Sequence, residues 1–193
     1  MISSFIIESC CHTTDYKFEW KNISLKYLDK TINENDRIYG IESSSDVFSF
    51  DKFGLRIMFQ GDLIAQNLIN FSLIQTANAQ VDCFNNYAPK YKIDNIQIET
   101  LADFDEYKLH NSNISSYFKA TKYNGILLSI EDLLKDMNEI NGDSRHESAL
   151  DQSIDLFLIE SPTIDSIFRF VIKVHLDNDT TLTDTTKTVK IIK

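Results

Sequence analysis

The side chains that could carry out chemistry are few and scattered along this chain. Cys10 and Cys11 are adjacent and Cys83 stands far from both. The four histidines are isolated from one another: His12, His110, His146 and His175. Zinc sites and activated nucleophiles need short, fixed spacings, such as Cys-x-x-Cys, His-Glu-x-x-His or Gly-x-Ser-x-Gly, and none of these occurs. The sequence therefore predicts no metal site, no cofactor and no nucleophilic catalysis.

Carboxylates are the abundant reactive groups, with 29 Asp and Glu residues. Asp177-Asn178-Asp179 and Asp184 bring oxygen ligands close together, as calcium requires. An EF-hand loop counted from Asp177 would need Gly and Glu where Leu182 and Thr188 stand, so we expect a polar turn instead. A pair of carboxylates facing each other across a cleft could still hydrolyse a glycan, and this alternative stays open.

Composition limits the partners and the size of the fold. The 193 residues are 42% hydrophobic and 11% aromatic, enough for one domain with a sizeable core. The net charge of -10, without a dense Lys/Arg cluster, argues against nucleic acid and against anionic membrane surfaces as partners. No apolar run is long enough to span a bilayer, so any link to a membrane must come from the N-terminal residues.

Strands dominate the predicted secondary structure. Apolar residues alternate with polar ones over most of the chain, with a one-residue slip near Lys21-Asn22 and another after Ile93 that predict β-bulges. The segments with this pattern are 16–28, 53–59, 69–73, 91–98, 154–158, 168–176 and 189–191. The pattern predicts an all-β antiparallel β-sandwich, either immunoglobulin-like or jelly-roll-like.

One amphipathic helix is expected within this sandwich, over residues 129–139. Ser129 followed by Asp132 is typical of a helix start, and Asn141-Gly142 of a helix end. The helix would be an insertion that covers one end or edge of the sheets.

Three aromatic residues fall in segments without strand alternation. Residues 75–90 are predicted to be a loop that carries Cys83 and Tyr87, and a second loop surrounds Tyr107. Tyr123 lies in a third irregular segment. Aromatic side chains on loops often anchor interfaces, so Tyr87, Tyr107 and Tyr123 are the candidate partner contacts.

The N-terminal residues allow two interpretations. Ile7-Glu8-Ser9-Cys10 resembles the cleavage box of bacterial lipoproteins, and the apolar residues before it resemble the end of a signal-peptide core. Residues 1–15 would then be a leader remnant, lipidation site and flexible tether, and residues 16–193 the folded domain. Alternatively, residues 2–7 form an ordinary first strand and the cysteine pair is incidental.

Taken together, these segments resemble a family of small Bacteroidetes-type lipoproteins of unknown function. The likeness covers nearly the whole chain and depends on these segments: Ser9-Cys10-Cys11, 16–18, 23–29, 53–59, 70–74, 129–132, 154–158, and 168–174 with 188–191.

The resemblance implies a lipid-anchored, non-enzymatic β domain at the outer membrane, on its periplasmic or outer face. It implies acylation of Cys10 and, in an oxidising compartment, a disulfide between Cys11 and Cys83, with two free thiols as the alternative. The expected role is binding an envelope protein or a glycan. A structural subunit of an outer-membrane complex is the other non-enzymatic alternative.

Overall fold

The computed structural model describes residues 15–33, 35, 37–64, 86–121, 125–139, 152–163 and 166–193. Within this part the fold is all-β and sandwich-like, as the alternation predicted. The largest sheet has the strand order β2-β1-β4-β9-β7-β8, with β5 beside β1. Its strands are β1 (Asp15–Ile32), β2 (Ile38–Ser43), β4 (Phe53–Leu63), β5 (Asn86–Pro89), β7 (Phe118–Thr121), β8 (Leu127–Leu128) and β9 (Ser153–Leu158).

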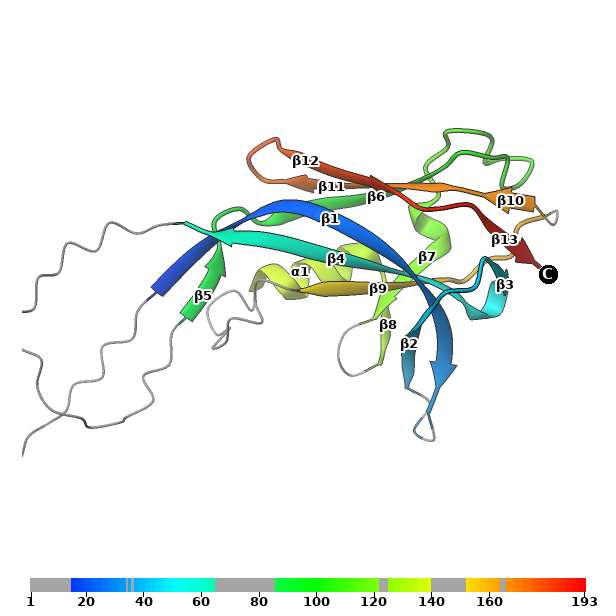
Figure 1. Ribbon diagram of the computed structural model, residues 1–193, viewed down its shortest axis with the longest axis horizontal. Coiled ribbons are helices and arrows are strands. Elements are labelled where there is room, and N and C mark those ends of the chain that lie inside the picture. The colour runs from blue at the N-terminus through cyan, green and yellow to red at the C-terminus, as the bar shows by residue number, and fades with distance from the viewer. Residues whose placement is uncertain are drawn as a thin grey trace, which may run out of the picture.

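The second layer is made by two three-stranded sheets, which Figure 1 shows end to end above the large sheet. One has the order β12-β11-β6 and the other β10-β13-β3. Their strands are β3 (Val47–Ser49), β6 (Ile93–Thr100), β10 (Ser166–Phe168), β11 (Phe170–Leu176), β12 (Thr181–Thr185) and β13 (Val189–Ile192). The predicted C-terminal strand over residues 168–176 is therefore interrupted at Arg169, where the chain passes from one small sheet to the other.

Side chains from both layers meet in a core that is rich in phenylalanine. The inward residues of β4 and β11 are fully buried, and the rings of Phe53 and Phe170 lie 5.6 Å apart across the layers. Both predicted bulges are present: Lys21 is the extra residue between β1 and β4, and Asp94 the extra residue between β6 and β11. Each bulge keeps the apolar side chains of its strand facing the core.

The predicted helix is confirmed as α1 (Ile130–Glu139). The hydroxyl of Ser129 accepts a hydrogen bond from the backbone N–H of Asp132 at 3.0 Å, which caps the helix as expected. Buried Leu133 and Leu134 lie on the face of α1 that packs against β6 and β7. The helix therefore closes one side of the sandwich.

Two strand pairings depart from the expected antiparallel arrangement. β5 pairs in parallel with β1, and β13 pairs in parallel with β3. The prediction of a loop over residues 75–90 was thus wrong for Asn86–Pro89. Residues 65–85, which include the strand predicted at 69–73, lie outside the described part.

The large sheet is buried on both faces where β1, β4 and β9 lie side by side at Leu28, Gly54 and Phe157. Leu28 and Phe157 point away from the main core, yet both are fully buried. Two glycines make room for them: a Cβ on Gly40 would lie 2.4 Å from Leu28 Cδ1, and one on Gly54 would lie 2.7 Å from Phe157 Cδ1. These four residues form a second apolar cluster beneath β2.

The last part of β1 and all of β2 extend beyond the body as a β1–β2 arm (residues 29–33 and 37–43; Figure 1). β4 begins opposite Asp29, so the residues of β1 beyond it pair with β2 alone. The N–H of Ile38 in β2 donates to the carbonyl of Gly125, 2.9 Å away. Gly125 lies just before β8, and β2 and β8 are the two ends of the large sheet. The sheet therefore curls so that its two ends come into contact.

The second apolar cluster yields a test of this packing. We expect Gly54→Ala to lower the free energy of unfolding by about 1–3 kcal/mol, because its methyl group would overlap the ring of Phe157. Gly61→Ala is the matched control, since its nearest contact is 3.1 Å and it should lose less. Urea unfolding measures both, and a Gly54→Ala protein as stable as wild type would contradict the packing.

Candidate functional site

The structure separates the predicted site residues into three groups. Cys10, Cys11, Cys83 and Tyr123 lie outside the described residues, so lipidation and the disulfide stay predictions. Tyr87 was wrongly predicted to be a partner contact, because it lies in β5, is buried and stacks on Tyr16 with the ring centroids 5.2 Å apart. Tyr107 does lie in a loop, and its side chain is 79% exposed.

Tyr107 belongs to the loop between β6 and β7, residues 101–114. Figure 1 shows this loop at the end of the molecule opposite the start of β1. Leu109 is 55% exposed in the same loop, so two large apolar side chains face solvent within three residues. Exposed apolar residues this close together are a candidate binding surface.

The carboxylate of Asp105 fixes the turn that carries Tyr107. Its Oδ1 accepts hydrogen bonds from the N–H groups of Tyr107, at 2.8 Å, and Lys108, at 2.7 Å. Its Oδ2 accepts a hydrogen bond from the hydroxyl of Tyr117, 2.7 Å away. An Asp that bonds the backbone two residues ahead forms an Asx turn, which holds the local φ and ψ angles.

The base of the loop is tied to the core on several sides. Phe104 is fully buried, with its ring 5.4 Å from Tyr117 and 5.3 Å from Phe168. Its N–H donates to the carbonyl of Lys108 at 2.8 Å, which closes the turn. The N–H of Thr163 donates to the carbonyl of Phe104 at 3.2 Å. The loop is therefore held at both its tip and its base.

The far side of the loop is fixed in the same way. The carboxylate of Asp103 accepts the N–H of His110 at 2.8 Å, and the His110 ring bonds the carbonyl of Leu101 through Nδ1 at 2.8 Å. Asn111 takes a left-handed backbone conformation with φ of 62°, and its N–H donates to Thr100. The 101–114 loop thus presents Tyr107 and Leu109 from a backbone that is already ordered.

The sequence predicted that Tyr107 lies on a loop, but not which residues position it there. Asp105 two residues ahead of Tyr107 is the one local signal, because that spacing is typical of an Asx turn. The bond from Asp105 to Tyr117 and the burial of Phe104 join residues far apart in the sequence, so no local pattern predicts them.

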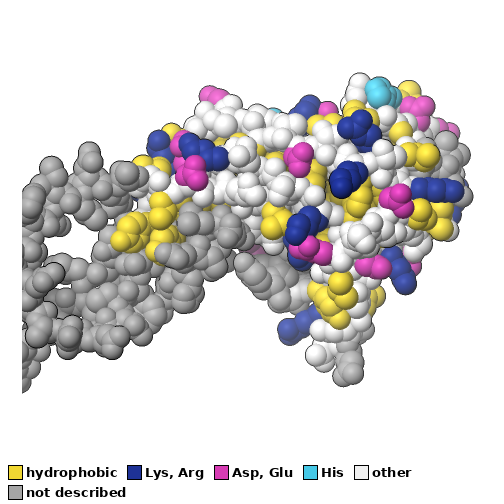
Figure 2. All heavy atoms as spheres, viewed as in Figure 1, with side chains coloured by type: hydrophobic (Ala, Val, Ile, Leu, Met, Phe, Trp, Pro, Cys, Tyr) yellow, Lys and Arg dark blue, Asp and Glu magenta, His cyan; other side chains and the backbone are white. Residues whose placement is uncertain are grey.

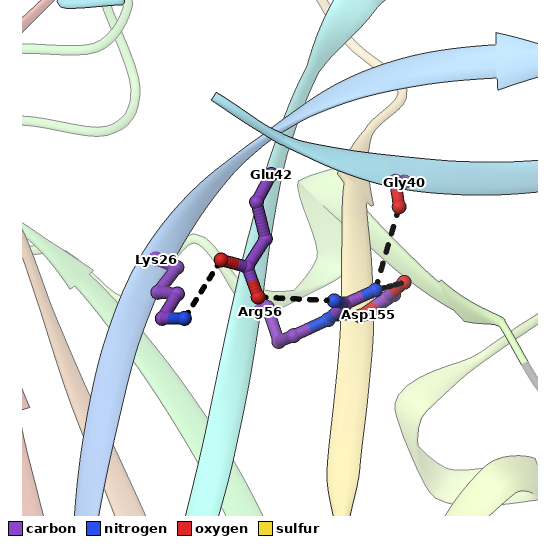
Figure 3. A network of polar contacts seen from close by, with 5 residues as sticks. All are labelled: Lys26, Gly40, Glu42, Arg56 and Asp155. Atoms are coloured by element: carbon purple, nitrogen blue, oxygen red, sulfur yellow. Dashed lines mark hydrogen bonds and ion pairs between the residues drawn. The ribbon is translucent and has the colours of Figure 1, made fainter. Parts of the chain in front are cut away.

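A cluster of charged side chains lies under the β1–β2 arm (Figure 3). The guanidinium of Arg56 binds both carboxylate oxygens of Asp155, at 2.6 and 2.8 Å, and also approaches Glu42 and the carbonyl of Gly40 at 3.4 Å. Lys26 bonds Glu42 at 2.7 Å. Bidentate Arg–carboxylate bonding is the strongest ion-pair geometry, so this network joins β2 to β4 and β9.

The chemistry of this network differs from that of a glycosidase pair. The hydrogen bond from Lys26 holds the pKa of the Glu42 carboxyl below its usual value, although desolvation acts in the opposite direction. A general acid needs a raised pKa, so Glu42 is suited to pairing with cations rather than to protonating a leaving group. Asp155 likewise faces the cation of Arg56, whose pKa is raised chiefly by its bond to Asp155.

Among the described residues, no three His, Cys, Asp or Glu side chains gather as a metal site requires. No helix of the described part is long and apolar enough to cross a membrane.

Comparison with protein-family models, with curated proteins and with solved structures finds no match to this chain. The resemblance to Bacteroidetes-type lipoproteins therefore stays a prediction.

The hydrogen bond between Tyr117 and Asp105 shifts the pKa of both side chains, which can be measured. Burial acts to raise the pKa of the Asp105 carboxyl, but its hydrogen bonds to Tyr117, Tyr107 and Lys108 outweigh this and lower it. The same carboxylate raises the pKa of Tyr117 to about 12. The bond therefore stabilises the fold between the two titrations, is lost as the pH falls through the lowered pKa of Asp105, and is lost as the pH rises through about 12.

We expect Asp105→Asn to bring the pKa of Tyr117 back toward the ordinary tyrosine value, because the negative charge facing the phenol is removed. NMR titration of tyrosine ring carbons measures it, with Tyr117→Phe to assign the signal. Asp103→Asn is the matched control, since its carboxylate bonds His110 rather than Tyr117. An unchanged titration in Asp105→Asn would contradict the described geometry.

Proposed function

We propose that this chain is a non-enzymatic, lipid-anchored binding module of the outer membrane, and that the 101–114 loop is its recognition element. The observation that supports the binding role is Tyr107, 79% exposed on a loop whose backbone is fixed by Asp105 and Phe104. Ordering the loop before binding removes much of the entropy cost that a mobile loop would pay. Tyrosine is also among the residues that contribute most to interface energies.

The anchor would act at the opposite end of the molecule. Cys10 precedes Asp15, the first residue of β1, by five positions, which an extended chain spans in about 17 Å. The start of β1 would then lie close to the membrane, while the 101–114 loop points away from it (Figure 1). Such an arrangement suits a module that presents its loop to an envelope protein or glycan, and the anchor would raise its local concentration there.

The anchoring step is tested with matched cysteine variants expressed in a bacterium with a lipoprotein-processing pathway. We expect metabolic labelling with a lipid analogue to mark wild type and Cys11→Ala, and to leave Cys10→Ala unlabelled and released from the membrane fraction. Labelling that persists in Cys10→Ala, or that is absent from wild type, would contradict the anchor.

The recognition step is tested by placing a photo-reactive amino acid at position 107 in cells. A discrete cross-linked product is expected there and not at Thr183, an exposed residue of β12. Once the partner is isolated, Tyr107→Ala should weaken binding by about 2 kcal/mol, roughly thirtyfold, as loss of an anchor residue does. Equal cross-linking at both positions, or unchanged binding by Tyr107→Ala, would contradict the role of the loop.

A further inference from the structure

The last four strands form one long C-terminal hairpin that spans both small sheets. β10 pairs with β13 and β11 pairs with β12, all antiparallel. At the junction of the two sheets, the N–H of Thr186 donates to the carbonyl of Phe170, and the N–H of Phe170 donates to the hydroxyl of Thr186, both at 2.9 Å. Both residues are buried, whereas Arg169 and Lys187 beside them are exposed. The two cations therefore lie on neighbouring positions of the outer face of the hairpin.

A third cation lies further along the same face. Lys190 stands between Ile167 of β10 and Val47 of β3, its cross-strand neighbours, and all three are exposed. Figure 2 shows Lys and Arg side chains on the right-hand part of the surface, where Figure 1 places β10 and β13. No carboxylate of the described residues forms an ion pair with Arg169, Lys187 or Lys190. These three residues are called the basic face below.

The acidic side chains of the same hairpin lie elsewhere. Asp177 and Asp179 are in the turn at its far end, and Asp184 is on the inner side of β12, since its partner in β11 is buried. Lys173, the other cation of the outer face, is paired with Glu99, with 2.6 Å between Nζ and Oε1. The whole chain has a net charge of -10, so the basic face is a local positive surface on an acidic protein.

Hydroxyl and amide groups occupy much of the rest of the outer face. Residues directly opposite each other on paired strands share a face of the sheet. The positions of β6 and β12 that lie opposite Lys173 and His175 of β11 are therefore also outer positions, and they are held by Asn95, Gln97, Thr181 and Thr183. Hydroxyl and amide side chains can both donate and accept hydrogen bonds, as the hydroxyls of sugars do.

This combination favours an anionic polysaccharide as the occupant. Its acidic groups would pair with the basic face, and its hydroxyls would bond the neighbouring threonines and amides. The described residues of the outer face include no Trp, Tyr or Phe. Protein interfaces are enriched in aromatic residues and depleted in lysine, and single-stranded nucleic acids stack on aromatic rings. Ile167 and Val47 offer a lipid surface little apolar area to bury.

We propose that the outer face of the C-terminal hairpin binds an anionic polysaccharide, with Arg169, Lys187 and Lys190 pairing with its acidic groups. Pairs between exposed charges are screened by salt, so the affinity falls as the salt concentration rises. The proposal does not depend on the lipid anchor or on the 101–114 loop.

The test titrates the full chain at low salt with two anionic polysaccharides, dextran sulfate and polygalacturonate, and follows binding by calorimetry. Uncharged dextran is the matched polymer control and should not bind. Arg169→Gln, Lys187→Gln and Lys190→Gln should each weaken binding by about threefold, the contribution of one exposed ion pair, and the triple variant by roughly thirtyfold. Lys119→Gln is the matched protein control, since it removes the same charge from an exposed position of β7 in the large sheet.

Wild-type protein gives a second readout that needs no variant. The amide NMR signals of Arg169, Lys187 and Lys190 should shift on addition of dextran sulfate, while that of Lys119 stays in place. Absence of binding to both anionic polymers overturns the proposal, as does an equal loss in Lys119→Gln or equal binding of uncharged dextran. Tighter binding through the same three residues to poly-L-glutamate, to DNA or to phosphatidylglycerol vesicles also overturns it, in favour of a protein, nucleic-acid or lipid partner.

Discussion

A continuous row of aromatic rings joins the middle of the sandwich to the exposed loop. Phe53 of the large sheet lies 5.6 Å from Phe170 of the second layer, which stacks on Phe168 at 5.8 Å. Phe168 then contacts Phe104, and Phe104 contacts Tyr117. Ring contacts of this kind add to the free energy of apolar burial, and the row extends the rigid core to the base of the 101–114 loop.

The 101–114 loop and the β1–β2 arm are held by different contacts. The 101–114 loop is ordered by the main core and by the carboxylate of Asp105. The β1–β2 arm is instead held by the second apolar cluster on the opposite face of the sheet and by the ion pairs of Arg56. The loop and the arm therefore depend on different structural supports.

The sequence predicted the parts of the fold that depend on local periodicity. Alternation identified the strands, the slip at Lys21 identified a bulge, and Ser129 identified the helix start. The sequence-based prediction failed where the burial of a residue depends on partners that are far away in the sequence. Tyr87 looked like a loop residue because its partner Tyr16 lies 71 positions away, and their strands pair in parallel. Phe157 was not recognised as core because a strand buried on both faces does not alternate. The prediction that Tyr107 lies on a loop is confirmed and its role as a contact stays a prediction, whereas its support from Phe104 and Tyr117 required the folded structure.

A recognition loop at Tyr107 must be both exposed and rigid. Backbone 15N relaxation measures this directly. For Tyr107 and Leu109 we predict order parameters of about 0.8, near those of the flanking strands. Values below about 0.6 would mean that the loop moves freely, and would contradict a preordered recognition element.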